Sequence, residues 1–341
     1  MASIHLPFKV NNSKRDVYKV LSAIKPNWEK KCVQIKNLEG GYSCHMKHCS
    51  CPNDNASSIS FRIRNLFIDS PLTDSDFELQ VLKVLSKNNL FPRIYATFEN
   101  GYCYEYVKGK ALINFPLIRN SIRVEKKMLR YRTVATQLAE IHKIPFFETE
   151  SQDYFIKLTK LLEKDFPKVT KLLSKRSLRS ELKCVESFLQ HKICNSSLVL
   201  SHGDLHIFNL LKKVDDSVLF LDWELTHMNH RAFDIAFFFQ TLCSIGMAKK
   251  VKFKLPRNAE RTFIKYYIQN CNHESTIDGS ALYCEVQIYK LVVLLYLMIT
   301  QSIYTDLAEM VSVNPQEYHQ QLLADYLQKK AAIMRVNGLE E

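Results

Sequence analysis

The chain has 341 residues, of which 46% are hydrophobic and 24% are charged. These proportions are those of a globular protein with one large domain or two lobes, and they exclude a largely disordered chain. The formal net charge of +12 suits nucleic acid, an anionic lipid surface or an anionic small molecule. The densest basic groups, residues 171–176 and 249–254, lack a nucleic-acid recognition pattern, so we interpret them as solvated faces and expect no nucleic-acid partner.

Three features of the sequence predict a soluble, cytoplasmic protein. Residues 1–9 lack the apolar core and the cleavage site of a signal peptide. The most apolar run, residues 291–300, is too short to span a bilayer and predicts a buried helix. The ten cysteines stand at irregular spacings, which favours reduced thiols, and the Cys/His-rich residues 44–51 fit no common zinc-site spacing.

The first part of the chain alternates short strands with turns. The spacing of apolar residues predicts a helix over residues 14–24, and an acidic helix start at residues 73–78 predicts a second helix through residue 85. Strands are predicted over residues 33–36, 42–50, 58–66, 93–98 and 102–107. Since Asn100-Gly101 is typical of a tight hairpin turn, we expect these strands to form a compact antiparallel lobe.

Beyond Gly109 the pattern becomes almost wholly helical. Helices are predicted over residues 124–142, 154–173, 180–191, 231–244, 258–269, 282–304 and 315–335. Residues 198–204 and 218–224 are exceptions, since each is an apolar run that ends in a carboxylate and is typical of a buried strand leading into a cleft. The sequence therefore predicts an α+β protein, with a small antiparallel β lobe in residues 1–108 and a larger, mostly helical lobe in residues 109–341.

These two acid-tipped segments carry the strongest signal for chemistry. The first reads His-Gly-Asp-Leu-His-Ile-Phe-Asn over residues 202–209, and the second reads Leu-Asp-Trp-Glu over residues 221–224. Phosphoryl transfer needs a base for the attacking hydroxyl, and oxygen ligands for the Mg²⁺ that neutralises the phosphates. Asp204 suits the base, and Asn209 and Asp222 suit the metal. Asp and Asn are also common loop residues, but the coincidence of both motifs favours chemistry.

These segments, together with residues 91–109 and 231–235, resemble the choline/ethanolamine kinase family, within a wider group that includes the aminoglycoside phosphotransferases. The order of motifs agrees from residue 38 to about residue 240, and residues 91–109 look closest to the ethanolamine kinase branch. The resemblance implies a two-lobed, protein-kinase-like fold. It also implies that the protein uses ATP and Mg²⁺ to phosphorylate the hydroxyl of an amino alcohol, with ethanolamine favoured.

The resemblance assigns the nucleotide-binding residues to the first lobe and to the helix that follows. Gly40 and Gly41 would lie in the loop over the phosphates, where glycine lets backbone amides approach an anion. Arg62 would contact phosphate and pair with Glu78. The backbone carbonyl of Glu105 and the backbone amide of Val107 would hold adenine. From the residues alone, Arg62 reads as part of an exposed strand face, and Glu78 as a first-turn carboxylate favoured by the helix dipole.

In the second lobe the resemblance implies roles for five acidic or amide side chains. Asp204 would be the catalytic base, with Asn209 and Asp222 as further catalytic residues. Asn209, Asp222 and Glu224 would hold the metal. Asp234 would support the catalytic loop through hydrogen bonds and is not expected to be catalytic.

The predicted acceptor pocket departs from the family pattern. We place His206, His230, Leu294 and Leu297 in this pocket. Histidine and methionine replace tyrosines near residue 230, and Leu294 and Leu297 stand where the family has tryptophans. A quaternary ammonium group is bound by aromatic faces because it has no N–H to donate. The loss of these aromatics therefore makes choline less favoured than ethanolamine.

Two alternatives stay open. One is a kinase of choline or of another small hydroxylated amine, and the other is a catalytically retired scaffold that binds a partner. Metal-chelating acids in one cleft have no physical purpose in a scaffold, so their retention argues for activity. The oligomeric state also stays open, a homodimer included.

Overall fold

The computed structural model describes residues 3–38, 44–54, 57–64, 70–112, 124–146, 154–163, 174–192, 198–248, 255–271, 277–303 and 314–336. The chain divides into two compact units, one of Met1–Ser70 and Leu79–Gly109 and the other of Pro71–Glu78 and Lys110–Glu341. Helix α2 (Ser75–Lys87) begins in the second unit and continues in the first. The predicted phosphate-loop residues Gly40 and Gly41 lie outside the described residues.

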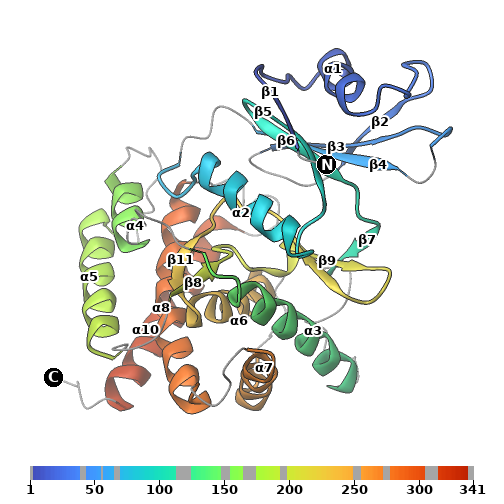
Figure 1. Ribbon diagram of the computed structural model, residues 1–341. Coiled ribbons are helices and arrows are strands. Elements are labelled where there is room, and N and C mark those ends of the chain that lie inside the picture. The colour runs from blue at the N-terminus through green and yellow to red at the C-terminus, as the bar shows by residue number, and fades with distance from the viewer. Residues whose placement is uncertain are drawn as a thin grey trace. The chain divides into compact units, whose positions relative to one another are not determined.

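The first unit is built on a six-stranded sheet (Figure 1). In sheet order the strands are β1 (Ile4–Leu6), β5 (Ile94–Phe98), β6 (Gly101–Glu105), β4 (Ser58–Arg64), β3 (Cys44–Ser50) and β2 (Gln34–Leu38). All neighbours run antiparallel except β1, which pairs parallel with β5. The five predicted strands and the mainly antiparallel lobe are therefore confirmed, whereas the short parallel strand β1 was not predicted. A three-residue edge strand is too short to show a periodic pattern.

One face of this sheet carries the core of the first unit. Ile59, Phe61 and Ile63 alternate along β4 and share a cluster with α1 (Lys14–Ile24), whose N-terminus is capped by the Ser13 side chain. Arg62 has the opposite parity and so points to the other face of the strand. It is only 3% exposed, which excludes the interpretation of Arg62 as part of an exposed strand face.

The turn between β5 and β6 requires its glycine and fastens the N-terminal segment. A Cβ atom on Gly101 would lie 2.0 Å from the backbone oxygen of Arg62, so no larger residue fits there. The buried Asn100 side chain accepts from the Val10 amide at 2.8 Å and donates to the Val10 carbonyl at 2.9 Å. These two bonds hold the segment that leads from β1 to α1.

The second unit is mostly helical (Figure 1). Its described helices are α3 (Val124–His142), α4 (Tyr154–Glu163), α5 (Lys175–Lys192), α6 (Ala232–Ala248), α7 (Arg257–Gln269), α8 (Gly279–Ile303) and α10 (Pro315–Val336). A helix is present at each position predicted from apolar spacing, and most ends differ by a few residues. Residues 164–173, the second half of the helix predicted over residues 154–173, lie outside the described residues. The mixed α+β architecture is thereby confirmed.

Helix α8 corrects one argument made from the sequence. Its segment Gly279–Thr300 is 22 residues long and apolar enough to cross a membrane. The argument that the apolar region is too short to span a bilayer is therefore wrong. The same helix packs against α5, α6, α7 and α10, and 78% of its apolar window is buried in the protein. Burial within the second unit explains the apolar composition, as it does for core helices generally.

Short strands of the second unit position the two acid-tipped segments. Strand β8 (Leu198–Ser201) pairs with β11 (His227–His230), and β9 (Leu210–Lys213) pairs with β10 (Val218–Phe220) and with β7 (Gly109–Ala111). Strands β8 and β10 confirm the two predicted strands. Strands β7, β9 and β11 were not predicted, because each has only three or four residues and lacks a continuous apolar run.

Candidate active site

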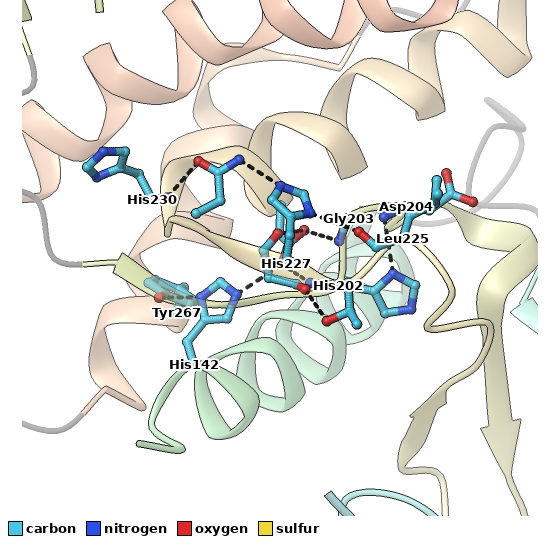
Figure 2. Close-up of polar contacts among 12 residues, drawn as sticks. His142, His202, Gly203, Asp204, Leu225, His227, His230 and Tyr267 are labelled. Carbon is cyan, nitrogen blue, oxygen red and sulfur yellow. Dashed lines mark hydrogen bonds and ion pairs between the residues drawn. The ribbon is translucent and has the colours of Figure 1, made fainter. Parts of the chain in front are cut away.

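The loop after β8 has a backbone that only glycine can adopt at one position. Gly203 has a φ of 84°, and a Cβ atom there would lie 2.0 Å from the carbonyl oxygen of Leu225. Leu225 lies two residues before His227, which is the first residue of β11. Figure 2 shows Gly203, Leu225 and His227 close together. The close approach of the two segments therefore sets the course of the chain immediately before Asp204.

The Asp204 carboxylate is held by two neighbours on its own loop. The Asn209 side-chain amide donates to the backbone oxygen of Asp204 at 3.0 Å and to its Oδ2 at 3.2 Å. The Nε2 atom of His206 lies 3.2 Å from the same Oδ2. Burial raises the pKa of Asp204, but the charge and hydrogen bond of His206 outweigh it and lower the pKa overall. Asp204 therefore stays ionised while its side chain remains 21% exposed.

Asp234 of α6 fixes the backbone of this loop from behind. Its Oδ1 accepts from the Ser201 hydroxyl at 2.8 Å and from the Gly203 amide at 3.1 Å. Its Oδ2 accepts from the His202 amide at 2.8 Å and from Nε2 of His142 at 3.1 Å. These four bonds agree with the supporting role expected for Asp234. Burial raises its pKa, but hydrogen bonds and nearby imidazoles, that of His142 first, lower the pKa to about 2.

The support of Asp234 extends to two residues that sequence reasoning missed. Because a carboxylate only accepts, Nε2 of His142 donates to Asp234, and Nδ1 of His142 is hydrogen-bonded to the Tyr267 hydroxyl at 2.8 Å. Figure 2 shows this chain running from Tyr267 through His142 toward His202 and Gly203. His142 ends α3 and Tyr267 lies in α7, so no local spacing could have revealed the contact.

Asp222 and Asn209 are brought together by the β9–β10 hairpin. Leu221 N donates to the backbone oxygen of Asn209 at 2.9 Å. Burial lowers the pKa of His206, but the charge and hydrogen bond of Asp204, followed by the charge of Asp222, raise this pKa overall. Asp222 has a φ of 65°, a left-handed conformation that is uncommon for any residue but glycine and concentrates at functional sites. Glu224 follows in the next turn and is half-buried.

The predicted metal ligands have the chemistry that Mg²⁺ prefers. They offer two carboxylates and one amide oxygen, and the hydrogen bonds of the Asn209 amide nitrogen to Asp204 leave its oxygen for a cation. No group of three or more His, Cys, Asp or Glu side chains that could hold a metal is found among the residues that the structure describes. Two carboxylates and one amide oxygen suit Mg²⁺, which usually completes its shell with water and phosphate.

Strand β11 carries a chain of buried polar groups beside the catalytic loop. Nδ1 of His227 donates to the Leu225 oxygen at 2.8 Å, and its Nε2 accepts from the Asn229 amide at 3.0 Å. The Asn229 oxygen in turn accepts from the His230 amide, and from the Tyr289 hydroxyl at 3.4 Å. Burial lowers the pKa of His227 to about 4, so its ring is neutral near pH 7.

The predicted acceptor residues lie in different surroundings. His206 contacts Asp204 directly, and the His230 ring lies 6.3 Å from that of Tyr289. Leu294 is fully buried in α8, whereas Leu297 is half-buried. Contact of these four side chains with an acceptor stays a prediction.

The predicted nucleotide residues that the structure describes belong to both units. Arg62, Glu105 and Val107 lie in the first unit, and Glu78 lies in the second. Both Arg62 and Glu78 are buried, and their mutual pairing stays a prediction. At the end of β6, Glu105 N donates to the Arg93 oxygen, and in the connector that follows Tyr106 N donates to the Ser58 oxygen. Neither bond uses the Glu105 carbonyl or the Val107 amide, the two groups predicted to hold adenine.

Comparison with known proteins identifies the family. Residues 35–327 match the family described as choline/ethanolamine kinase. Ethanolamine kinase 2 of Mus musculus is 25% identical over 264 residues, which are 74% of this chain and 64% of the relative. The match thus spans less than two thirds of the relative's length. The chain belongs to the choline/ethanolamine kinase family, as the motifs predicted.

Solved structures of two family members share the fold. An ethanolamine kinase of Plasmodium vivax superposes with a TM-score of 0.71 and 18% identity, covering 92% of this chain and 89% of its own. A choline kinase of Cryptosporidium parvum superposes with a TM-score of 0.72 and 21% identity, covering 96% of this chain and 98% of its own. The kinase-like fold predicted from the sequence is therefore confirmed.

Proposed function

We propose that the protein is a kinase that uses Mg²⁺ and ATP to phosphorylate the hydroxyl of an amino alcohol, with ethanolamine the favoured acceptor. The observation that carries the proposal is the contact of the Asp204 carboxylate with His206 and Asn209, on a loop whose neighbouring segment carries Asp222. Membership of the choline/ethanolamine kinase family supports the same reaction. The names of the ethanolamine kinase relatives support the choice of acceptor.

Each group in the proposed site has a separate task. Asp204 accepts the proton of the acceptor hydroxyl as its oxygen attacks phosphorus, and its lowered pKa keeps it ready as a carboxylate. Asn209, Asp222 and Glu224 would hold Mg²⁺, which neutralises phosphate charge when bound. Asp234 and His142 keep the loop backbone in place through the bonds described above.

The nucleotide side of the proposal rests on six further residues. Gly40 and Gly41 would cover the phosphates, Arg62 and Glu78 would act as a phosphate-contacting pair, and the backbone at residues 105 and 107 would bind adenine. The burial of Arg62 supports a specific role, because a charged side chain is seldom buried without one.

Ethanolamine is favoured over choline for a physical reason. A trimethylammonium group gains roughly 0.5–2 kcal/mol from each aromatic face that surrounds it. Leu294 and Leu297 provide no such face, whereas a primary ammonium group can be satisfied by oxygen acceptors. A cytoplasmic location belongs to the same proposal, and it is supported by the finding that no disulfide joins the cysteines of the described residues.

The test is ATP consumption by the purified protein with ethanolamine, choline, their methylated intermediates and several aminoglycosides. We expect turnover with ethanolamine to exceed turnover with the other acceptors, and Asp204→Asn to lower it by about a hundredfold or more, while nucleotide affinity is kept. Asp215→Asn is the matched control, because Asp215 is exposed in the β9–β10 hairpin and the same change there should have no effect. A wild-type protein inactive on every acceptor, or an Asp204→Asn variant within threefold of wild type, would refute the assignment.

A further inference from the structure

Tyr154, the first residue of α4, packs on side chains of β11 and α6 next to the catalytic loop. Its ring stacks on that of His227, with centroids 4.6 Å apart and planes 7° from parallel, and it meets Phe233 edge-on at 4.8 Å. The His227 ring in turn bonds the Leu225 carbonyl, whose oxygen approaches Gly203 most closely. Tyr154 is therefore joined by direct contacts to the segment that carries Asp204.

The hydroxyl of Tyr154 is buried without a hydrogen bond. The residue is 8% exposed, and within the part of the chain that the structure describes its oxygen has no partner. By contrast, the buried hydroxyls of Tyr267 and Tyr326 each bond a neighbour, at 2.8 Å and 2.6 Å. A buried polar group left without a partner is costly and rare, so such a group near a reactive site indicates a partner that arrives with a ligand.

The electrostatic surroundings of this hydroxyl favour a cation. Burial raises the pKa of Tyr154 well above its ordinary value, and the charges of Asp204 and Asp234 raise it further. The phenol is therefore neutral, and the charged groups that shift its pKa are both carboxylates. The stacked His227 ring is neutral as well, so it does not repel a positive charge. Asp234 already accepts four bonds from the protein, which leaves Asp204 and the phenol oxygen to meet a ligand.

We propose that the Tyr154 hydroxyl accepts a hydrogen bond from an N–H of the acceptor's primary ammonium group, which makes Tyr154 a specificity-determining residue. This inference rests on the proposed function and names the chemical class of its acceptor, a hydroxylated primary amine. The two ends of such a molecule divide the site, since Asp204 takes the hydroxyl proton and Tyr154 receives the ammonium. A quaternary ammonium has no N–H, so its binding leaves the buried phenol unsatisfied and is disfavoured.

The test compares wild type with Tyr154→Phe, which removes one oxygen atom and keeps the stacked ring. We expect kcat/KM for ethanolamine to fall at least about tenfold, since a hydrogen bond to a charged group contributes at least that factor. The kcat/KM for choline should change by less than about threefold, and KM for ATP should stay within about twofold. The Tm of the ligand-free protein should stay constant or rise, because the variant removes a buried polar group that has no partner.

Tyr267→Phe is the matched control, because it removes a buried hydroxyl that does have a partner, and its Tm should fall. An ethanolamine kcat/KM within threefold of wild type overturns the role of Tyr154, as does an equal loss for choline or a Tm lowered as much as in Tyr267→Phe. These results leave the proposed function standing. A wild-type protein without activity on any amine overturns both proposals, so the two failures are distinguishable.

Discussion

Replacement of Asp234 by asparagine tests the support behind the catalytic loop. The carboxylate accepts four hydrogen bonds, two at each oxygen, and the residue is 1% exposed. An amide keeps one oxygen and places an NH₂ group opposite two donors. Whichever carboxylate oxygen the NH₂ group replaces, one backbone amide, that of His202 or that of Gly203, is left without its acceptor.

The expected loss in the free energy of unfolding follows from the number of hydrogen bonds that the variant loses. At least one buried backbone N–H loses its acceptor, and the remaining bonds lose their charge assistance. With about 1.5–3 kcal/mol for a hydrogen bond to a charged group, we expect Asp234→Asn to lower the free energy of unfolding by about 3 kcal/mol. Ser201→Ala deletes a single donor to the same carboxylate and should cost about half as much.

Urea denaturation at pH 7 measures both variants, with the free energy extrapolated to water and the m-values compared. The wild-type protein should also show a pH dependence that Asp234→Asn lacks. Because folding lowers the pKa of Asp234 from 3.8 to about 2, the carboxylate stabilises the protein above pH 3.8 and loses that effect as pH falls toward 2. This difference in pKa corresponds to about 2 kcal/mol in the free energy of unfolding. A loss below about 1 kcal/mol at pH 7, or one no larger than that of Ser201→Ala, would refute the reasoning.

Three further outcomes are expected. Gly203→Ala should lower the free energy of unfolding by about 2 kcal/mol or more, read from the same urea curves, because the new Cβ would meet a carbonyl oxygen at 2.0 Å; a neutral effect would contradict this. Asn209→Ala and Asp222→Ala should weaken nucleotide binding about tenfold in calorimetric titrations with Mg²⁺ but not without it, and equal losses would show that they are not ligands. Leu297→Trp should shift the ratio of kcat/KM toward choline if α8 lines the pocket, and an unchanged ratio would exclude that; fully buried Leu294 is a poor site for this test, because tryptophan would overpack the core.

The sequence predicted those parts of the site that lie within short motifs. Asp204, Asn209 and Asp222 could be found because two strand ends and a hairpin bring them together locally. His142 and Tyr267 could not, since their contacts with the site join residues 92 and 125 positions apart. Tyr154 was missed for a related reason. Its proposed role depends on a buried hydroxyl without a hydrogen-bond partner, and the spacing of residues in a sequence does not reveal such a group.

The fold was predicted where periodicity extends over many residues. Helices α1 and α3 have the predicted bounds because their apolar faces repeat over several turns. Strands β1, β7, β9 and β11 were missed, since three or four residues show no clear alternation and their pairing is set by tertiary contacts. The long apolar helix α8 shows the opposite error. The helix and its burial were predicted correctly, but the argument against a membrane span considered only the central apolar run, residues 291–300, and not the whole apolar segment Gly279–Thr300.

The β9–β10 hairpin makes the spacing of the two predicted metal-ligand segments independent of its own tip. The ladder pairs Leu210 with Phe220, so the residues just outside it, Asn209 and Leu221, meet whatever the length of the connection. The tip is exposed to solvent, since Val214 has 84% of its surface accessible. Residues could therefore be inserted at the tip, an environment-sensitive fluorophore included, without altering the geometry of the site. The hairpin thus offers an attachment point for a reporter of nucleotide binding.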